Sequence, residues 1–170
     1  MHPASPRRRL LVALLALFPA LSAALTAGAA RAAEAGPAPR LEAELLDGSR
    51  FSLAQRRDGI TLVSVWSPES LSSRKCIWEL QRFATAYDAR GVQVLAASTL
   101  DNPAALRAFV AERKLTLPVG ILRGHELGPL DELRFPLVYV FDRNGQLRAA
   151  HAGLYSMRVL ERLVAPLLPP

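Results

Sequence analysis

The chain has 170 residues, a formal net charge of +6 and 51% hydrophobic residues, which fits one globular domain. Residues 1–32 hold four of the 21 basic residues and none of the 15 acidic ones, so the remainder carries 17 basic residues and a net charge of +2. That remainder has no run of lysine or arginine with interleaved aromatic residues, and nucleic-acid binding is therefore not expected.

Residues 1–32 have the organisation of a secretory signal peptide. Arg7–Arg9 are positively charged, Leu10–Leu25 is mostly apolar, and Ala30–Ala32 provides a small-x-small cleavage site. The alternative is an uncleaved membrane anchor, but Pro19 and the run of alanines do not favour a spanning helix, which needs ~20 strongly apolar residues. We expect cleavage and a periplasmic or otherwise exported protein, with membrane contact only if the leader is retained.

The chain contains a single cysteine, Cys76. In an exported protein this excludes an intramolecular disulfide. Residues 33–40, which contain Pro37 and Pro39, are predicted to be a linker. Residues 41–170 are predicted to form one domain, which is long enough to bury a core without a disulfide.

The first half of this domain is predicted to begin with a β-hairpin, because Leu41–Leu45 and Phe51–Leu53 alternate around an Asp47-Gly48 turn. Ile60–Trp66 is apolar and rich in β-branched residues, which predicts a strand buried on both faces. A helix is predicted to open at Ser70, because apolar residues recur at helical spacing after it. Gly91 is predicted to end that helix.

The second half alternates predicted strands and helices. We expect a strand over 92–97, a helix capped by Asn102 and running over 103–114, a short edge strand over 117–122, one or two helical turns over 126–133, a hairpin of strands 137–142 and 146–150, and a last helix capped by Ser156 and reaching about Leu167. This order predicts an α/β fold with a central mixed sheet and helices on both faces.

Residues 63–80 carry the most informative pattern. The segment from Val63 to Lys75 resembles the active-site segment of the TlpA/ResA branch of the thioredoxin-like superfamily, the AhpC/TSA or redoxin-like proteins, whose pattern is roughly V-x-F-W-A-x-W-C-x-x-C-R-x-E-x-P-x-L. Trp66 matches the family tryptophan, and Arg74 follows the second cysteine position. The two cysteines of the motif correspond to Ser70 and Ser73, so the CxxC is replaced by Ser70-Leu71-Ser72-Ser73.

The resemblance covers about residues 41–168. It implies a thioredoxin-like fold with an N-terminal β-hairpin and the helix-plus-strand insertion of TlpA and ResA, here 103–122. Phe135-Pro136 followed by an apolar strand is similar to the family's cis-proline segment, which faces the redox motif. The resemblance also implies thiol-disulfide chemistry, which this chain departs from.

A serine at either position of the motif cannot carry out dithiol exchange, which needs a thiolate attacker and a resolving thiol. Ser70 and Ser73 are interpreted as N-cap and first-turn residues. Ser64 stands where classical thioredoxins have a buried aspartate that transfers protons. Catalysis by a serine would need a nearby base, and His125 and His151 are both interpreted as surface residues.

Cys76 lies one helical turn beyond Ser73. Its default interpretation is a buried, inert thiol. The alternative is a monothiol site that forms mixed disulfides or binds a soft metal. No metal cluster or cofactor motif is found, and neither a metal nor a cofactor is expected.

A second set of residues predicts a binding surface. In thioredoxin-like proteins the backbone before the cis-proline pairs with an extended substrate segment, a form of strand addition that needs no thiol. The candidate binding residues of such a shallow apolar groove are Trp66, Pro68, Leu71, Phe135 and Pro136. A rigid turn that serves folding alone is the alternative.

Two functions from different classes follow. The first is a cell-envelope protein with a degenerate redox motif that binds extended polypeptide or a partner protein without dithiol-disulfide turnover. The second is a thiol-disulfide oxidoreductase or antioxidant redoxin that acts through Cys76 or a partner's thiol.

Overall fold

The computed structural model describes residues 37–56 and 59–169. The predicted signal peptide and the first part of the predicted linker lie outside these ranges. In the described part of the chain, no helix is both long enough and apolar enough to span a membrane.

The strands are β1 (Leu41–Leu45), β2 (Arg50–Ser52), β3 (Ile60–Trp66), β4 (Val92–Ser98), β5 (Val119–His125), β6 (Leu137–Phe141) and β7 (Leu147–Ala152). The α-helices are α2 (Leu71–Tyr87), α3 (Pro103–Glu112) and α4 (Met157–Val164), and the 3-10 helices are η1 (Leu53–Gln55), η2 (Asp88–Arg90), η3 (Glu132–Arg134) and η4 (Ala165–Leu167).

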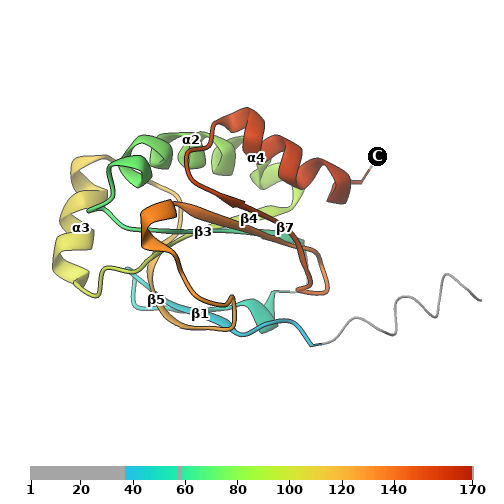
Figure 1. Ribbon diagram of the computed structural model, residues 1–170, viewed down its shortest axis with the longest axis horizontal. Helices are drawn as coiled ribbons and strands as arrows, with labels where there is room; N and C mark the ends of the chain where they lie inside the picture. The colour runs from blue at the N-terminus through green and yellow to red at the C-terminus, as the bar shows by residue number, and fades with distance from the viewer. Residues whose placement is uncertain (1–36, 57–58, 170) are drawn as a thin grey trace, which may run out of the picture. The chain divides into compact units, whose positions relative to one another are not determined.

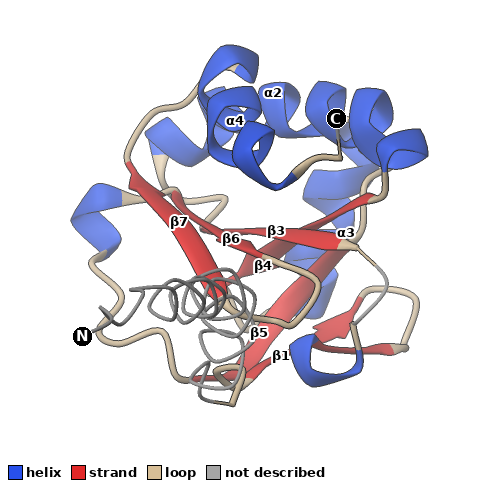
Figure 2. Cartoon of the chain, turned by 90° about the vertical axis from the view of Figure 1, so that its right-hand side faces the viewer, coloured by secondary structure: helices blue, strands red, loops and turns tan. Residues whose placement is uncertain are grey.

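The seven strands form one mixed sheet in the order β2-β1-β5-β4-β3-β6-β7. Strands β3, β4 and β5 are parallel, and the remaining neighbours are antiparallel. Helices α2 and α4 lie side by side over one face of this sheet (Figures 1 and 2). The predicted hairpins at both ends of the domain are confirmed, and the bounds of β3 match the prediction.

Strand β5 corrects the prediction of an edge strand over 117–122. It lies between β4 and β1, and the hairpin of β1 and β2 covers its outer side. Proline cannot donate a hydrogen bond to a neighbouring strand, so it is disfavoured inside a central strand. In the structure Pro118 precedes the strand, and its carbonyl oxygen accepts a hydrogen bond from the Ala96 N–H at 2.9 Å.

Helix α2 begins and ends where its local chemistry requires. The Ser70 side chain accepts a hydrogen bond from the Ser73 N–H at 3.3 Å, which satisfies one of the free donors of the first turn. Beyond α2, η2 continues the chain to Gly91, whose φ of 74° is readily available to glycine and ends the helical segment.

The sheet separates two hydrophobic clusters, because successive side chains of a strand point to opposite faces. Ile60, Leu62 and Trp66 of β3 belong to the first cluster, together with residues of α2, α3 and α4. Val63 and Val65 belong to the second, which also takes in Leu53 of η1 and Phe135 beside η3. Helical segments therefore contribute on both faces, although the three α-helices all pack into the first cluster.

The start of α4 differs from the prediction. Ser156 occupies the N-cap position, but its side chain makes no capping hydrogen bond. Instead, Glu79 of α2 accepts a hydrogen bond from the Met157 N–H at 2.8 Å. An acidic side chain suits this position, because the N-terminus of a helix carries partial positive charge. The same contact ties α4 to α2.

Candidate functional site

The residues of the predicted motif and the predicted cis-proline lie at the same end of the sheet. Strand β3 runs into α2 through residues 67–70, and β6 pairs antiparallel with β3 so that Leu137 lies opposite Val65. This register places Pro136 next to Trp66, the last residue of β3. The Phe135-Pro136 peptide bond is cis.

Ser70 and Ser73 use their hydroxyl groups to build the start of α2. Ser70 Oγ accepts the Ser73 N–H, and Ser73 Oγ accepts the Ser67 N–H at 3.4 Å. Ser73 is 1% exposed. Within the described residues, no histidine, aspartate or glutamate is hydrogen bonded to either hydroxyl, so neither is paired with a general base. The geometry supports the interpretation of Ser70 as the N-cap and of Ser73 as a first-turn residue.

Cys76 lies below this site in the first cluster, 2% exposed. Its Sγ accepts the Tyr155 N–H at 3.2 Å and lies 3.5 Å from the Tyr155 carbonyl oxygen, to which the thiol donates. Burial raises the pKa of the Cys76 thiol, and the nearby Glu79 carboxylate raises it further, while the hydrogen bond from Tyr155 opposes both. A raised pKa and a covered sulfur both disfavour nucleophilic attack.

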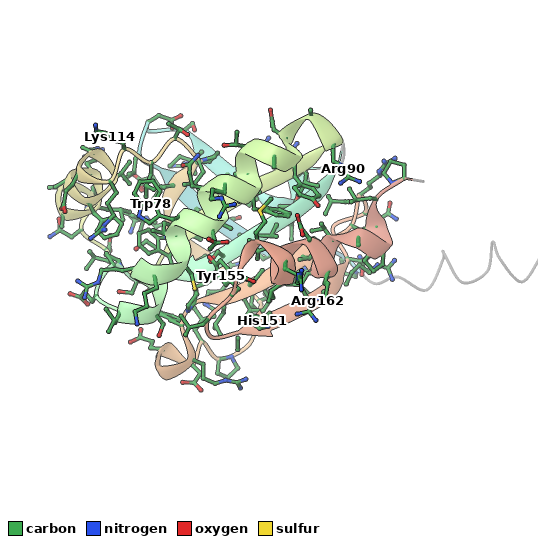
Figure 3. The ribbon with its side chains drawn as sticks, turned by 90° about the horizontal axis from the view of Figure 1, so that it is seen from above. Trp78, Arg90, Lys114, His151, Tyr155 and Arg162 are labelled. Atoms are coloured by element: carbon green, nitrogen blue, oxygen red, sulfur yellow. The ribbon has the colours of Figure 1, made fainter. Side chains whose placement is uncertain are left out.

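Tyr155 is the central residue of this buried region, and sequence reasoning missed it. Its hydroxyl group lies 3.1 Å from Ser64 Oγ, and burial raises the pKa of the phenol above its ordinary value. Figure 3 shows Tyr155 between α2 and α4 when the molecule is seen from above. Ser64, which stands where classical thioredoxins have a proton-transferring aspartate, therefore has a neutral hydroxyl partner. Tyr155 stands in a short loop with no periodic pattern, and no sequence signal links it to Ser64.

Trp66 is not part of an open surface, because it is 1% exposed. The ring of Phe109 on α3 packs against it with 5.3 Å between ring centroids. Its indole Nε1 has no hydrogen-bond partner among the described residues. Trp66 thus contributes to packing between β3 and α3 rather than to a groove.

The Phe135 N–H, which precedes the cis-proline, is already hydrogen bonded within the chain. The Phe135 N–H donates to the Glu132 carbonyl oxygen at 3.2 Å, and the Pro136 carbonyl oxygen accepts from the Gly153 N–H at 2.9 Å. Phe135 is 3% exposed, and its side chain belongs to the second cluster. Strand addition through the Phe135 N–H would therefore need the turn at η3 to open.

Two of the predicted binding residues remain accessible. Leu71 is 60% exposed and Pro68 is half-buried, while Trp66, Phe135 and Pro136 are buried. The structure thus brings the five residues to one end of the sheet without forming an open groove from all of them.

His125 and His151 are half-buried and make hydrogen bonds with backbone groups. His125 Nδ1 accepts the Leu127 N–H at 3.4 Å, and His151 Nε2 lies 3.0 Å from the Leu154 carbonyl oxygen. In the described ranges, no group of three or more His, Cys, Asp or Glu side chains has the arrangement of a metal site.

This arrangement defines a class of protein: a thioredoxin-like α/β fold with a cis-proline beside the start of a helix, in which hydroxyl groups replace the two thiols of the family. A match to the AhpC/TSA family covers residues 35–150, and the chain belongs to this family. The resemblance to TlpA/ResA-type redoxins and the predicted fold class are thereby confirmed.

Individual relatives agree with this assignment. The chain is 28% identical over 109 residues to the thiol-disulfide oxidoreductase YkuV of Bacillus subtilis (strain 168), a match that spans 61% of this chain and 74% of the relative. A thiol-disulfide isomerase from Corynebacterium glutamicum has a similar structure, with a TM-score of 0.67, 22% identity and coverage of 81% of this chain and 99% of that one. A thiol:disulfide interchange protein from Chlorobium tepidum TLS gives a TM-score of 0.67 at 19% identity, over 80% and 98% of the two chains.

Proposed function

We propose that this chain is an exported, redox-inactive member of the AhpC/TSA family that binds a partner protein or an extended polypeptide in the cell envelope. The observation that carries the proposal is the state of Ser70 and Ser73. The Ser70 hydroxyl caps the start of α2 and the Ser73 hydroxyl accepts the Ser67 N–H of the preceding loop, and neither can form a disulfide or pass electrons. The fold around them is intact.

The burial of Cys76 supports the absence of thiol turnover. A thiol that exchanges disulfides must reach a partner's sulfur as a thiolate. Cys76 is covered, its pKa is raised, and the chain has no second cysteine to resolve a mixed disulfide. The alternative function, an oxidoreductase acting through Cys76 or a partner's thiol, is consistent with the family, but the environment of Cys76 does not favour it.

Turnover is tested by insulin reduction with dithiothreitol. We expect the wild-type rate to equal that of the Ser70→Ala/Ser73→Ala variant, because neither carries the required sulfur. The matched positive control is Ser70→Cys/Ser73→Cys in a Cys76→Ser background, which restores two thiols at the helix start, where the pKa of a thiol is lowered. Wild-type turnover above the alanine variant would contradict the proposal.

The proposed binding rests on the accessible residues beside the start of α2. In this chain Leu71 is the most exposed of the predicted binding residues, so Leu71→Asp changes the surface without disturbing the core. Phe135→Asp is unsuitable, since it would bury a charge in the second cluster. Envelope extract passed over immobilised wild type and Leu71→Asp should leave less bound protein on the variant. Equal recovery would exclude this end of the sheet as the contact.

Export is a separate part of the proposal and rests on residues 1–32. N-terminal sequencing of the protein recovered from the periplasm should begin near Ala33. Recovery of the uncleaved chain in the membrane fraction would instead support a retained anchor.

A further inference from the structure

One exposed face of α2 carries four residues that neither the core nor the serine site explains. These residues share one face of the helix because they stand at positions i, i+3, i+4 and i+7; they are Leu71, Arg74, Lys75 and Trp78. Each is exposed, including Leu71 at 60% and Trp78 at 45%. We call these four residues the α2 stripe. In Figure 3, Trp78 lies on the side of α2 nearest α3, away from His151.

The two apolar members of the α2 stripe are unusual for a solvent-facing helix surface. Tryptophan and leucine bury large areas when they have a partner, and tryptophan is among the residues most enriched at the centres of protein interfaces. The other tryptophan, Trp66, is buried in the core. Leu71 and Trp78 are seven residues apart, so they lie about 10 Å apart along the helix axis.

The two cations between them are uncompensated. Among the described residues, neither Arg74 nor Lys75 has an ion-pair partner. Glu79, the acid in the next turn, already accepts hydrogen bonds from Arg82 and from the Met157 N–H. The partial positive charge at the start of α2 adds to the potential of these cations. Glu69, exposed ahead of the helix, opposes it from one end.

We infer that the α2 stripe binds an acidic, amphipathic segment of a partner protein, one that places carboxylates between two apolar side chains. The inference rests on the proposed function and names the chemistry of the partner. Carboxylates would pair with Arg74 and Lys75, and the apolar side chains would cover Leu71 and Trp78. A helix with apolar residues at i and i+7 and glutamates between them has the matching spacing.

A membrane surface fits the α2 stripe less well than a protein segment. Helices that bind membranes present a continuous apolar face flanked by several cations. In the α2 stripe the two cations lie between the two apolar side chains. This arrangement suits a protein segment in which acidic side chains lie between apolar ones. The experiment must therefore distinguish binding to vesicles from binding to a peptide.

The probe is a labelled 14-residue helical peptide. It has leucine at positions i and i+7 and glutamate at positions i+3 and i+4. Its binding to the full chain is measured by fluorescence anisotropy, beside a second peptide in which lysine replaces each glutamate. We expect the acidic peptide to bind wild type and Arg74→Glu/Lys75→Glu to weaken it by about tenfold, since two surface ion pairs become two repulsions. The lysine peptide should bind the reversed variant better than it binds wild type, which is a rescue that a merely unfolded variant cannot show.

Arg158→Glu/Arg162→Glu is the matched control, because it reverses two exposed cations on α4 and should leave binding of the acidic peptide unchanged. No binding of the acidic peptide, equal binding of both peptides, or equal loss in the α4 control would each overturn the inference. Tighter binding to vesicles of 3:1 phosphatidylcholine and phosphatidylglycerol than to the peptide, abolished by Arg74→Glu/Lys75→Glu, would replace it with a membrane contact. Insulin reduction does not depend on Arg74 or Lys75, so that assay tests the absence of thiol turnover independently of this result.

Discussion

The buried pair of Ser64 and Tyr155 gives the sharpest test of how the first cluster is held together. Their hydroxyl groups lie 3.1 Å apart, Ser64 is 1% exposed, and Tyr155 is 6% exposed. Because both groups are removed from water, each depends on the other for a hydrogen bond. Truncating one partner should therefore leave an unsatisfied polar group, whereas truncating both should not.

The size of the effect follows from this asymmetry. Ser64→Ala and Tyr155→Phe should each lower the free energy of unfolding by about 1–3 kcal/mol, which combines the lost hydrogen bond with the cost of an unpaired buried group. The double variant loses the bond but has no unpaired hydroxyl, so its loss should be smaller than the sum. We expect a coupling energy of about 1–2 kcal/mol.

Urea denaturation followed by far-UV circular dichroism measures all four proteins, with the free energy taken from the midpoint and slope. The control is Ser49→Ala combined with Tyr155→Phe, because Ser49 lies in the exposed turn between β1 and β2. That pair should be additive. Additivity of Ser64→Ala and Tyr155→Phe within about 0.5 kcal/mol would refute the account.

Three other changes have defined outcomes. Lys114 has a φ of 51° just beyond α3, where its N–H donates to the Ala111 carbonyl oxygen. Because glycine adopts a positive φ readily, Lys114→Gly should raise the free energy of unfolding by about 0.5–1 kcal/mol in urea titrations. A lower free energy of unfolding would show that the lysine side chain stabilises the turn. Maleimide should label Cys76 slowly until denaturant is added, because the sulfur is covered and its pKa is raised; rapid labelling of the folded chain would contradict its burial. The pKa of Asp142 is lowered. Partial burial opposes this shift, but hydrogen bonds from the Gln146 N–H and from Arg148 stabilise the carboxylate and lower the pKa. A carboxyl group with a lowered pKa in the folded state stabilises the protein above about pH 4, and this stabilisation is lost as the pH falls. Wild type should therefore lose more stability than Asp142→Asn between pH 5 and pH 2, and equal losses would exclude this carboxylate as the cause.

Sequence patterns predicted the elements whose signals are local. The β-branched run Ile60–Trp66 and the Asn102-Pro103 helix start are confirmed, since each depends on neighbouring residues. The α3 helix ends two residues before the predicted Lys114, because the chain turns there through a left-handed residue. The edge position predicted for β5 was wrong, because strand order depends on pairing between distant segments.

The environment of the site residues was harder to predict for the same reason. Trp66 is buried by Phe109, a residue 43 positions further along the chain. The Phe135 N–H is engaged by η3, which periodicity indicated only as one or two helical turns. Replacement of the thiols by Ser70 and Ser73, by contrast, could be predicted from the motif alone.

If the chain is exported as proposed, the position of Cys76 has a consequence for its folding in an oxidising compartment. A chain that crosses a membrane unfolded presents its sulfur to every disulfide-forming catalyst it meets. Once α2 and the loop at Tyr155 close over the sulfur, that risk ends. For an exported chain, rapid folding after translocation would therefore protect the molecule from being trapped as a covalent adduct.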